Sequence, residues 1–170
     1  MVAGGAGTVI NNDPLMVTRP ITITGNFDQT ETATGELDFL LSSTTDPKQY
    51  QLTVTGTASL ADGLGIDLAS GFHLAAGDSF DLIATAPYGA LSGGFDSLSL
   101  GAAACSAHAA DVWRCGGFYF DLAVVTGAGG TVDLSVAAVP EPSTWTLLGL
   151  GFLGLGGLAL RRRSVRAAAD

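Results

Sequence analysis

The residue types that most often perform catalysis are scarce in this chain. Its 170 residues include only two histidines, His73 and His108, and two cysteines, Cys105 and Cys115. His73 alternates with apolar neighbours, which predicts a strand position that faces away from the core. His108 lies between the cysteines and near Asp111, where a Cys–His or His–Asp pair could activate a nucleophile. A disulfide would remove that thiol, and we therefore expect neither histidine to be catalytic.

The carboxylates are scattered along the chain, with Asp62, Asp67, Asp78 and Asp81 near expected turns and strands. Two carboxylates can hydrolyse a glycosidic bond wherever they meet in space, so their spacing in the sequence leaves that activity open. The chain has no Asp-x-Asp-x-Asp-Gly calcium loop, and its Gly-rich stretches lack the lysine of a phosphate-binding loop. We expect a protein that is not an enzyme and that has no metal and no cofactor.

The two cysteines are better explained as a structural pair. They stand ten residues apart and do not form the CxxC spacing of a metal or redox site. If the protein is exported, a disulfide between Cys105 and Cys115 can persist. The alternative is a pair of free thiols.

The charge is divided unevenly along the chain. Before Pro140 there are 14 acidic residues and three basic ones, a net charge of −11, whereas the remainder carries +2. An acidic segment of this kind will not bind nucleic acid through phosphate contacts. It suits a soluble surface exposed outside the cell.

Apolar and polar residues alternate in short runs between glycines, which is typical of β-strands. We therefore predict an all-β ectodomain over residues 21–138, preceded by a flexible or truncated segment over residues 1–20. The Ala-rich stretch 102–110 is expected to be a loop. A β-sandwich and a β-solenoid both fit the pattern. The predicted strands are 21–24, 37–41, 50–54, 64–68, 80–82, 98–100, 118–122 and 132–136, with a further run beginning at Leu60.

The C-terminal region, residues 139–170, has a different composition. Residues 144–160 carry no charge and are rich in leucine and glycine, which predicts a transmembrane helix at the short end of the usual length. Arg161, Arg162 and Arg163 follow at once and should stay in the cytoplasm, leaving the ectodomain outside.

This region resembles the PEP-CTERM sorting signal of Gram-negative bacteria. The resemblance rests on Val139, Pro140, Glu141 and Pro142, the apolar run and the arginines that follow. It implies that an exosortase, a membrane protease-transpeptidase, recognises the signal and processes the chain near this motif. It also implies an inner-membrane precursor, delivery to the cell surface or extracellular matrix, and an association with exopolysaccharide.

The ectodomain has a second resemblance, to the closing coils of autotransporter-like parallel β-helices. It rests on Gly25-Asn-Phe-Asp-Gln29, on Tyr50-Gln-Leu-Thr-Val-Thr-Gly56, and on the later Gly-Phe and Gly-Asp-Ser-Phe-Asp-Leu segments. The resemblance favours a short parallel β-solenoid over a sandwich. Because residues 1–20 lack the features of a signal peptide, we expect that the true beginning of the protein lies upstream.

Three functions remain open from the sequence. The favoured one is a structural component of the cell surface or matrix. The second is a carbohydrate-binding or adhesive module for exopolysaccharide, in which exposed Tyr88 and Trp113 would stack on sugars, although such residues are more often packing anchors. An enzyme acting on polysaccharide is the least favoured.

Overall fold

The computed structural model of the protein describes residues 7–29, 35–42 and 51–139. The chain divides into two compact units, Met1–Val139 and Pro140–Asp170. All of the described residues belong to the first unit, which is called the β unit below.

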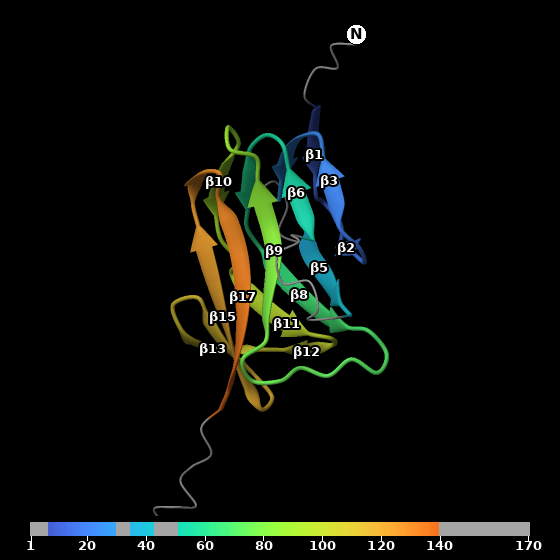
Figure 1. Ribbon diagram of the computed structural model, residues 1–170, viewed down its shortest axis with the longest axis vertical. Coiled ribbons are helices and arrows are strands. Elements are labelled where there is room, and N and C mark those ends of the chain that lie inside the picture. Colours follow the sequence, from blue (N-terminus) through green and yellow to red (C-terminus); the bar gives the residue numbers. More distant parts are fainter. Residues whose placement is uncertain (1–6, 30–34, 43–50, 140–170) are drawn as a thin grey trace, which may run out of the picture. The chain divides into compact units, whose positions relative to one another are not determined.

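The described strands form three sheets, A, B and C (Figure 1). Sheet A contains β1 (Gly7–Ile10), β4 (Gly25–Asp28), β7 (Ala58–Leu60), β10 (Ala90–Gly93) and β16 (Gly127–Ala128), in that spatial order. Sheet B has the order β12 (Ala103–Ala104), β11 (Ser97–Leu100), β8 (Gly63–Leu68), β5 (Glu36–Leu41) and β2 (Leu15–Val17). Sheet C has the order β13 (Ser106–Ala109), β14 (Val112–Cys115), β15 (Phe118–Val125), β17 (Thr131–Ala138), β9 (Ser79–Thr85), β6 (Leu52–Val54) and β3 (Ile21–Ile23).

The first eleven strands follow a repeating path. The chain visits sheets A, B and C in turn three times, and then returns to A and B with β10 and β11. Equivalent strands of successive turns pair in parallel, as β1 does with β4, β2 with β5 and β3 with β6. We call each turn a coil: the first coil is residues 7–23, the second 25–54 and the third 58–85. The predicted all-β class is confirmed for the described residues.

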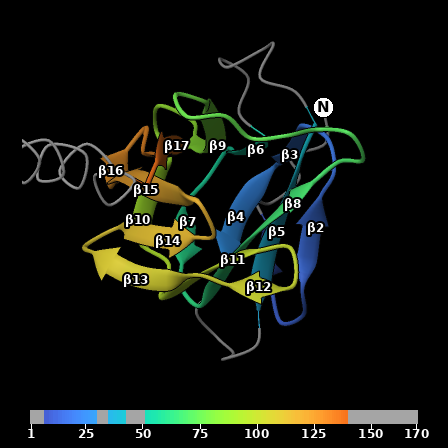
Figure 2. The same ribbon diagram turned by 90° about the horizontal axis from the view of Figure 1, so that it is seen from below.

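The remaining strands pair antiparallel with their neighbours, and they do so in all three sheets. Strand β12 pairs with β11, β16 pairs with β10, and β17 pairs with β9. Strands β13, β14 and β15 then extend sheet C as an antiparallel meander beyond β17. The sheets are therefore mixed, and a purely parallel arrangement describes only the first part of the β unit. In Figure 2 the meander lies on the opposite side of the unit from β2 and β3.

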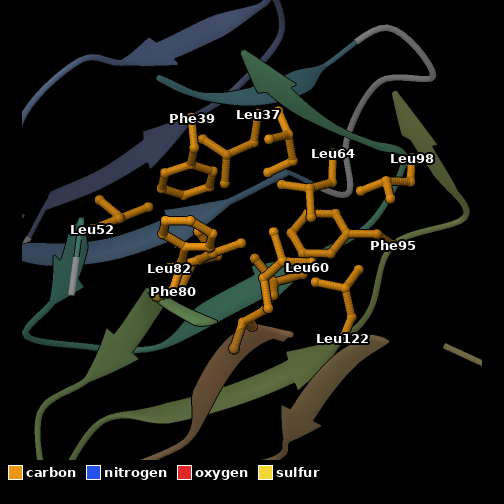
Figure 3. Close-up of a cluster of buried hydrophobic side chains, with 14 of the residues drawn as sticks. Leu37, Phe39, Leu52, Leu60, Leu64, Phe80, Leu82, Phe95, Leu98 and Leu122 are labelled. Atoms are coloured by element: carbon orange, nitrogen blue, oxygen red, sulfur yellow. The ribbon is translucent and has the colours of Figure 1, made fainter. Parts of the chain in front are cut away.

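The core consists of apolar side chains stacked from one coil to the next. In sheet A the strand register aligns Val9, Phe27, Ala58 and Leu91. In sheet B it aligns Leu15, Leu37, Leu64 and Leu98, and the last three meet Phe39, Phe95 and Leu122 in the buried cluster drawn in Figure 3. Each strand contributes alternate residues to these stacks, because successive side chains of a strand point to opposite faces.

Glycines mark the place where each coil begins. A Cβ at Gly25 would overlap the carbonyl oxygen of Gly7, one at Gly56 that of Gly25, and one at Gly89 that of Gly56. Gly25 also has a φ of +124°, which side-chain-bearing residues rarely adopt. The glycines that punctuate the sequence therefore allow close backbone contact between neighbouring coils.

Two buried amides hold the next corner of the coils. The Asn11 side chain donates from Nδ2 to the Glu36 carbonyl at 3.2 Å, which joins the first coil to the second. Gln29, with no exposed surface, donates from Nε2 to the carbonyls of Gly35 at 2.7 Å and Gly63 at 3.2 Å, which joins the second coil to the third. These bonds tie neighbouring coils together at this corner.

The structure differs from two expectations about secondary structure. Residues 1–20 were expected to be a flexible or truncated segment, and the structure has β1 and β2 within that range. Pairing with β4 and β5 stabilises these two strands, whose own residues do not alternate between apolar and polar types. Residues 102–110 were expected to be a loop, yet they contain β12 and β13. In β13 the pairing with β14 overrides the low strand propensity of alanine.

No helix among residues 7–29, 35–42 and 51–139 is long and apolar enough to cross a membrane. The helix predicted over residues 144–160 lies outside the described residues.

Candidate functional site

The predicted sorting signal follows β17, a strand in the interior of sheet C. Strand β17 is paired with β15 on one side and β9 on the other, and its last pair joins Ala138 to Phe118. One residue further on, the Val139 N–H donates to the Gly117 carbonyl at 3.1 Å. The backbone is therefore held by hydrogen bonds up to the first residue of the predicted motif. Pro140, Glu141, Pro142 and the arginines Arg161, Arg162 and Arg163 lie outside the described residues.

A disulfide links the start of the meander to its second strand. Cys105 and Cys115 are bonded, with their Cα atoms 4.6 Å apart. Trp113, two residues before Cys115, is only 7% exposed and belongs to the core cluster. Trp113 is therefore a packing anchor and is not available to stack on a sugar.

Polar and aromatic side chains gather on the outer face of the same meander. The rings of His108 and Tyr119 lie 4.6 Å apart between centroids, tilted by 35°. Arg114 stands directly opposite Tyr119 in the register of β14 and β15, so the two side chains share a face. We call His108, Arg114 and Tyr119 the ring platform. It combines flat apolar surface with hydrogen-bond donors, which is the chemistry that sugars require.

Tyr88, the other aromatic residue considered for sugar stacking, is fully exposed. It follows β9 in the loop that leads to β10. Tyr88 is therefore available to a ligand.

A group of carboxylates lies on the outer face of sheet B. Asp38 is in register with Gly65 on β8, and a Cβ on Gly65 would overlap the Asp38 carboxylate. Partial burial raises the pKa of Asp38, and the charges of Glu36 and Asp67 raise the pKa further. Ser99 Oγ donates to Glu36 Oε1 at 3.0 Å. These carboxylates repel one another.

The two histidines lie in different elements of the β unit. His73 is exposed as predicted, but it lies in the loop between β8 and β9 and not on a strand. His108 lies on β13 and stacks on Tyr119. Within the described ranges, no three His, Cys, Asp or Glu side chains form a group that could hold a metal ion.

The ring platform could not be found from motif spacing, because His108 and Tyr119 come from different strands of the meander. One signal was present: Tyr119 lies between Phe118 and Phe120, so alternation directs it to the face opposite the buried Phe120.

Comparison with known proteins identifies one segment. Residues 138–163 match the family described as the PEP-CTERM protein-sorting motif. The match begins at the last residue of β17 and includes Pro140, Glu141, Pro142 and all three arginines. No curated protein and no solved structure matches the chain. The resemblance of the β unit to autotransporter coils therefore has no support from these comparisons. At its C-terminus the chain carries a PEP-CTERM protein-sorting motif.

Proposed function

We propose that this protein is an exported surface component whose C-terminal signal is recognised by an exosortase. The observation that carries the proposal is the PEP-CTERM match over residues 138–163. The precursor is held in the inner membrane by the apolar segment, with the β unit outside the cytoplasm. Processing then delivers the β unit to the cell surface or the extracellular matrix.

The β unit is the cargo, and we propose a structural, non-catalytic role for it as a short β-solenoid. Parallel coils and a continuous apolar interior support this role, because each coil is stabilised by its neighbours and little depends on a ligand. The bonded cysteines also favour it, since neither thiol is available as a nucleophile.

The sorting proposal can be tested by changing the motif alone. The chain would be expressed behind an export signal in a host that has an exosortase, with Pro140, Glu141 and Pro142 all changed to alanine. We expect this variant to stay at full length in the membrane fraction, while the unchanged chain is shortened and reaches the surface. Ser143→Ala, directly beside the motif, is the matched control and should behave like the unchanged chain. Normal shortening of the triple variant would contradict the proposal.

The second candidate function is binding of exopolysaccharide, and the ring platform favours it. The stacked rings of His108 and Tyr119 supply an apolar surface, and Arg114 supplies donors in an otherwise acidic unit. Exopolysaccharide purified from the host should bind the chain, and Tyr119→Leu or Arg114→Ala should weaken binding by about tenfold or more. Arg19→Ala, an exposed arginine in the first coil, is the control and should leave binding unchanged. Equal binding by all of these variants would remove this candidate.

A further inference from the structure

The ring platform is part of a row of residues that crosses four strands of sheet C. The strand register aligns Ser106 on β13, Arg114 on β14, Tyr119 on β15 and Ala137 on β17 (Figure 2). Arg114 and Ala137 are exposed, so the row lies on the outer face of the sheet. His108 contacts the Tyr119 ring. On the side away from Arg114, Ala137 carries only a methyl group and is too small to cover that ring.

A second row, one step along the same strands, carries a carboxylate and hydroxyl groups. Asp121 follows Tyr119 by two residues on β15, so the two side chains share a face. Ser135 on β17 stands directly opposite Asp121, and Ser79 on β9 stands opposite Ser135. Asp121 and both serines are exposed. The outer face therefore offers hydrogen-bonding groups beside an aromatic ring.

These two rows match the two kinds of surface that a sugar presents. A pyranose has an apolar face of C–H groups, which can stack on the Tyr119 ring. Its hydroxyl groups can donate to the Asp121 carboxylate, and its oxygens can accept from Arg114. Because Asp121 and Tyr119 share a face, one sugar unit or two adjoining units can contact both.

The charge of this surface decides which class of sugar fits it. Residues 103–125 contain Asp111 and Asp121 but only Arg114 as a basic residue, a net charge of −1. Further along the same face, Asp133 on β17 stands opposite Asp81 on β9. An acidic polysaccharide would bring a negative charge toward these carboxylates with every charged unit, and one arginine cannot compensate for that repulsion. A neutral sugar meets no such repulsion.

We propose that the outer face of the meander binds the neutral sugars of an exopolysaccharide and rejects acidic ones. Tyr119 stacks on the sugar ring, while Asp121 accepts hydrogen bonds from its hydroxyl groups. This proposal rests on the second candidate function and deepens it by naming the class of polysaccharide.

The class of ligand can be tested with the full-length chain in detergent and exopolysaccharide purified from the host. Anion exchange separates that material into neutral and acidic fractions. We expect the neutral fraction to bind at least about tenfold more tightly than the acidic one. Raising NaCl to about 0.5 M should change neutral binding less than about twofold, because the neutral ligand carries no charge to be screened. Tighter binding of the acidic fraction would overturn this proposal and leave the second candidate function standing, whereas no binding of either fraction would remove both.

Asp121 is the residue that separates this proposal from binding by the rings alone. Asp121→Asn should weaken binding of the neutral fraction by about fivefold or more, because the amide offers fewer acceptors. Asp121→Lys should also increase binding of the acidic fraction by at least about tenfold.

The matched controls are Asp96→Asn and Asp96→Lys, which make the same changes of charge at an exposed aspartate between β10 and β11. Both should leave binding of either fraction within about twofold. An equal gain of acidic binding by Asp96→Lys and Asp121→Lys would show an effect of net charge alone and would overturn the proposed site.

A second variant guards against a folding defect at Asp121. Ser135→Ala removes an exposed hydroxyl opposite Asp121 and should weaken neutral binding by about threefold, with an unchanged circular dichroism spectrum. Ser97→Ala, at an exposed serine of β11 in sheet B, is its control and should bind like the unchanged chain. If neither Asp121→Asn nor Ser135→Ala weakens binding, the second row does not contact the ligand and the proposal is wrong.

Discussion

The two ends of the β unit are built differently although the same three sheets reach both. On β1 of the first coil Val9 is 44% exposed, while Leu91 on β10 occupies the equivalent place in the stack and is 1% exposed. The difference comes from the strands that cover each end. Antiparallel strands, a disulfide and Trp113 cover the last parallel strands, whereas no described residue covers the first coil.

This contrast shows how a stack of coils is terminated. A parallel coil always leaves an open edge, and reversing the chain direction is one way to fill that edge from the same polypeptide. The β unit does this at the end from which the sorting segment leaves. Strand β17, the last described strand before the sorting motif, is held there by pairing with both β15 and β9.

Equivalent residues at the two ends give the largest expected contrast. Leu91→Ala should lower the free energy of unfolding by about 2–5 kcal/mol, because it leaves a cavity in a covered core. Val9→Ala should cost less than about 1 kcal/mol, because its side chain is half exposed before the change. Urea unfolding followed by circular dichroism measures both. Equal losses would mean that the first coil is covered in solution.

Removal of the disulfide should weaken the end of the β unit that contains the meander. With both Cys105 and Cys115 changed to alanine, we expect a loss of about 2–4 kcal/mol, since the unfolded chain gains freedom. Hydrogen exchange would show where the loss falls. Amides of β13 and β14 should exchange faster, while the exchange of those in β1 to β3 stays unchanged. A uniform increase in exchange over the β unit would show that the disulfide does not stabilise the meander locally.

The carboxylates of sheet B should have the smallest effect. Because burial and then Glu36 and Asp67 raise the pKa of Asp38, its charged form is disfavoured in the folded state. At neutral pH the charged Asp38 therefore lowers the stability of the folded state. This destabilisation disappears as the pH falls through the raised pKa and then below the ordinary value of 3.8.

Asp38→Asn should therefore raise the Tm at pH 7 by on the order of 1–3 °C, a small gain because solvent screens the partly exposed group. The gain should vanish near pH 3. Thermal unfolding at the two pH values measures it, and a lower Tm at pH 7 would show that the carboxylate stabilises the fold.

Alternation in the sequence predicted the strands that have large inward residues. Strands β5, β8, β15 and β17 were found because their buried leucines, valines and phenylalanines stand two residues apart. Strands β1 and β2 were missed because their residues, Gly7–Ile10 and Leu15–Val17, do not alternate between apolar and polar types. Pairing with later coils stabilises them.

The change from parallel to antiparallel pairing could not be predicted, because a period of two residues is the same for both kinds of strand. The presence of the PEP-CTERM sorting motif was predicted and is confirmed by the match over residues 138–163, since its residues are contiguous and need no fold to be recognised. The ring platform depends on contacts between β13 and β15, so only the fold brings its residues together.

The most direct test of the central claim is the intact mass of the protein that an exosortase-containing host delivers to its surface. The hydrogen bonds of β17 and Val139 predict that cleavage falls after Val139, so the mass should correspond to a complete β unit without residues 161–163. Delivery of the uncut chain, or a cut before Val139 that removes part of β17, would contradict the account.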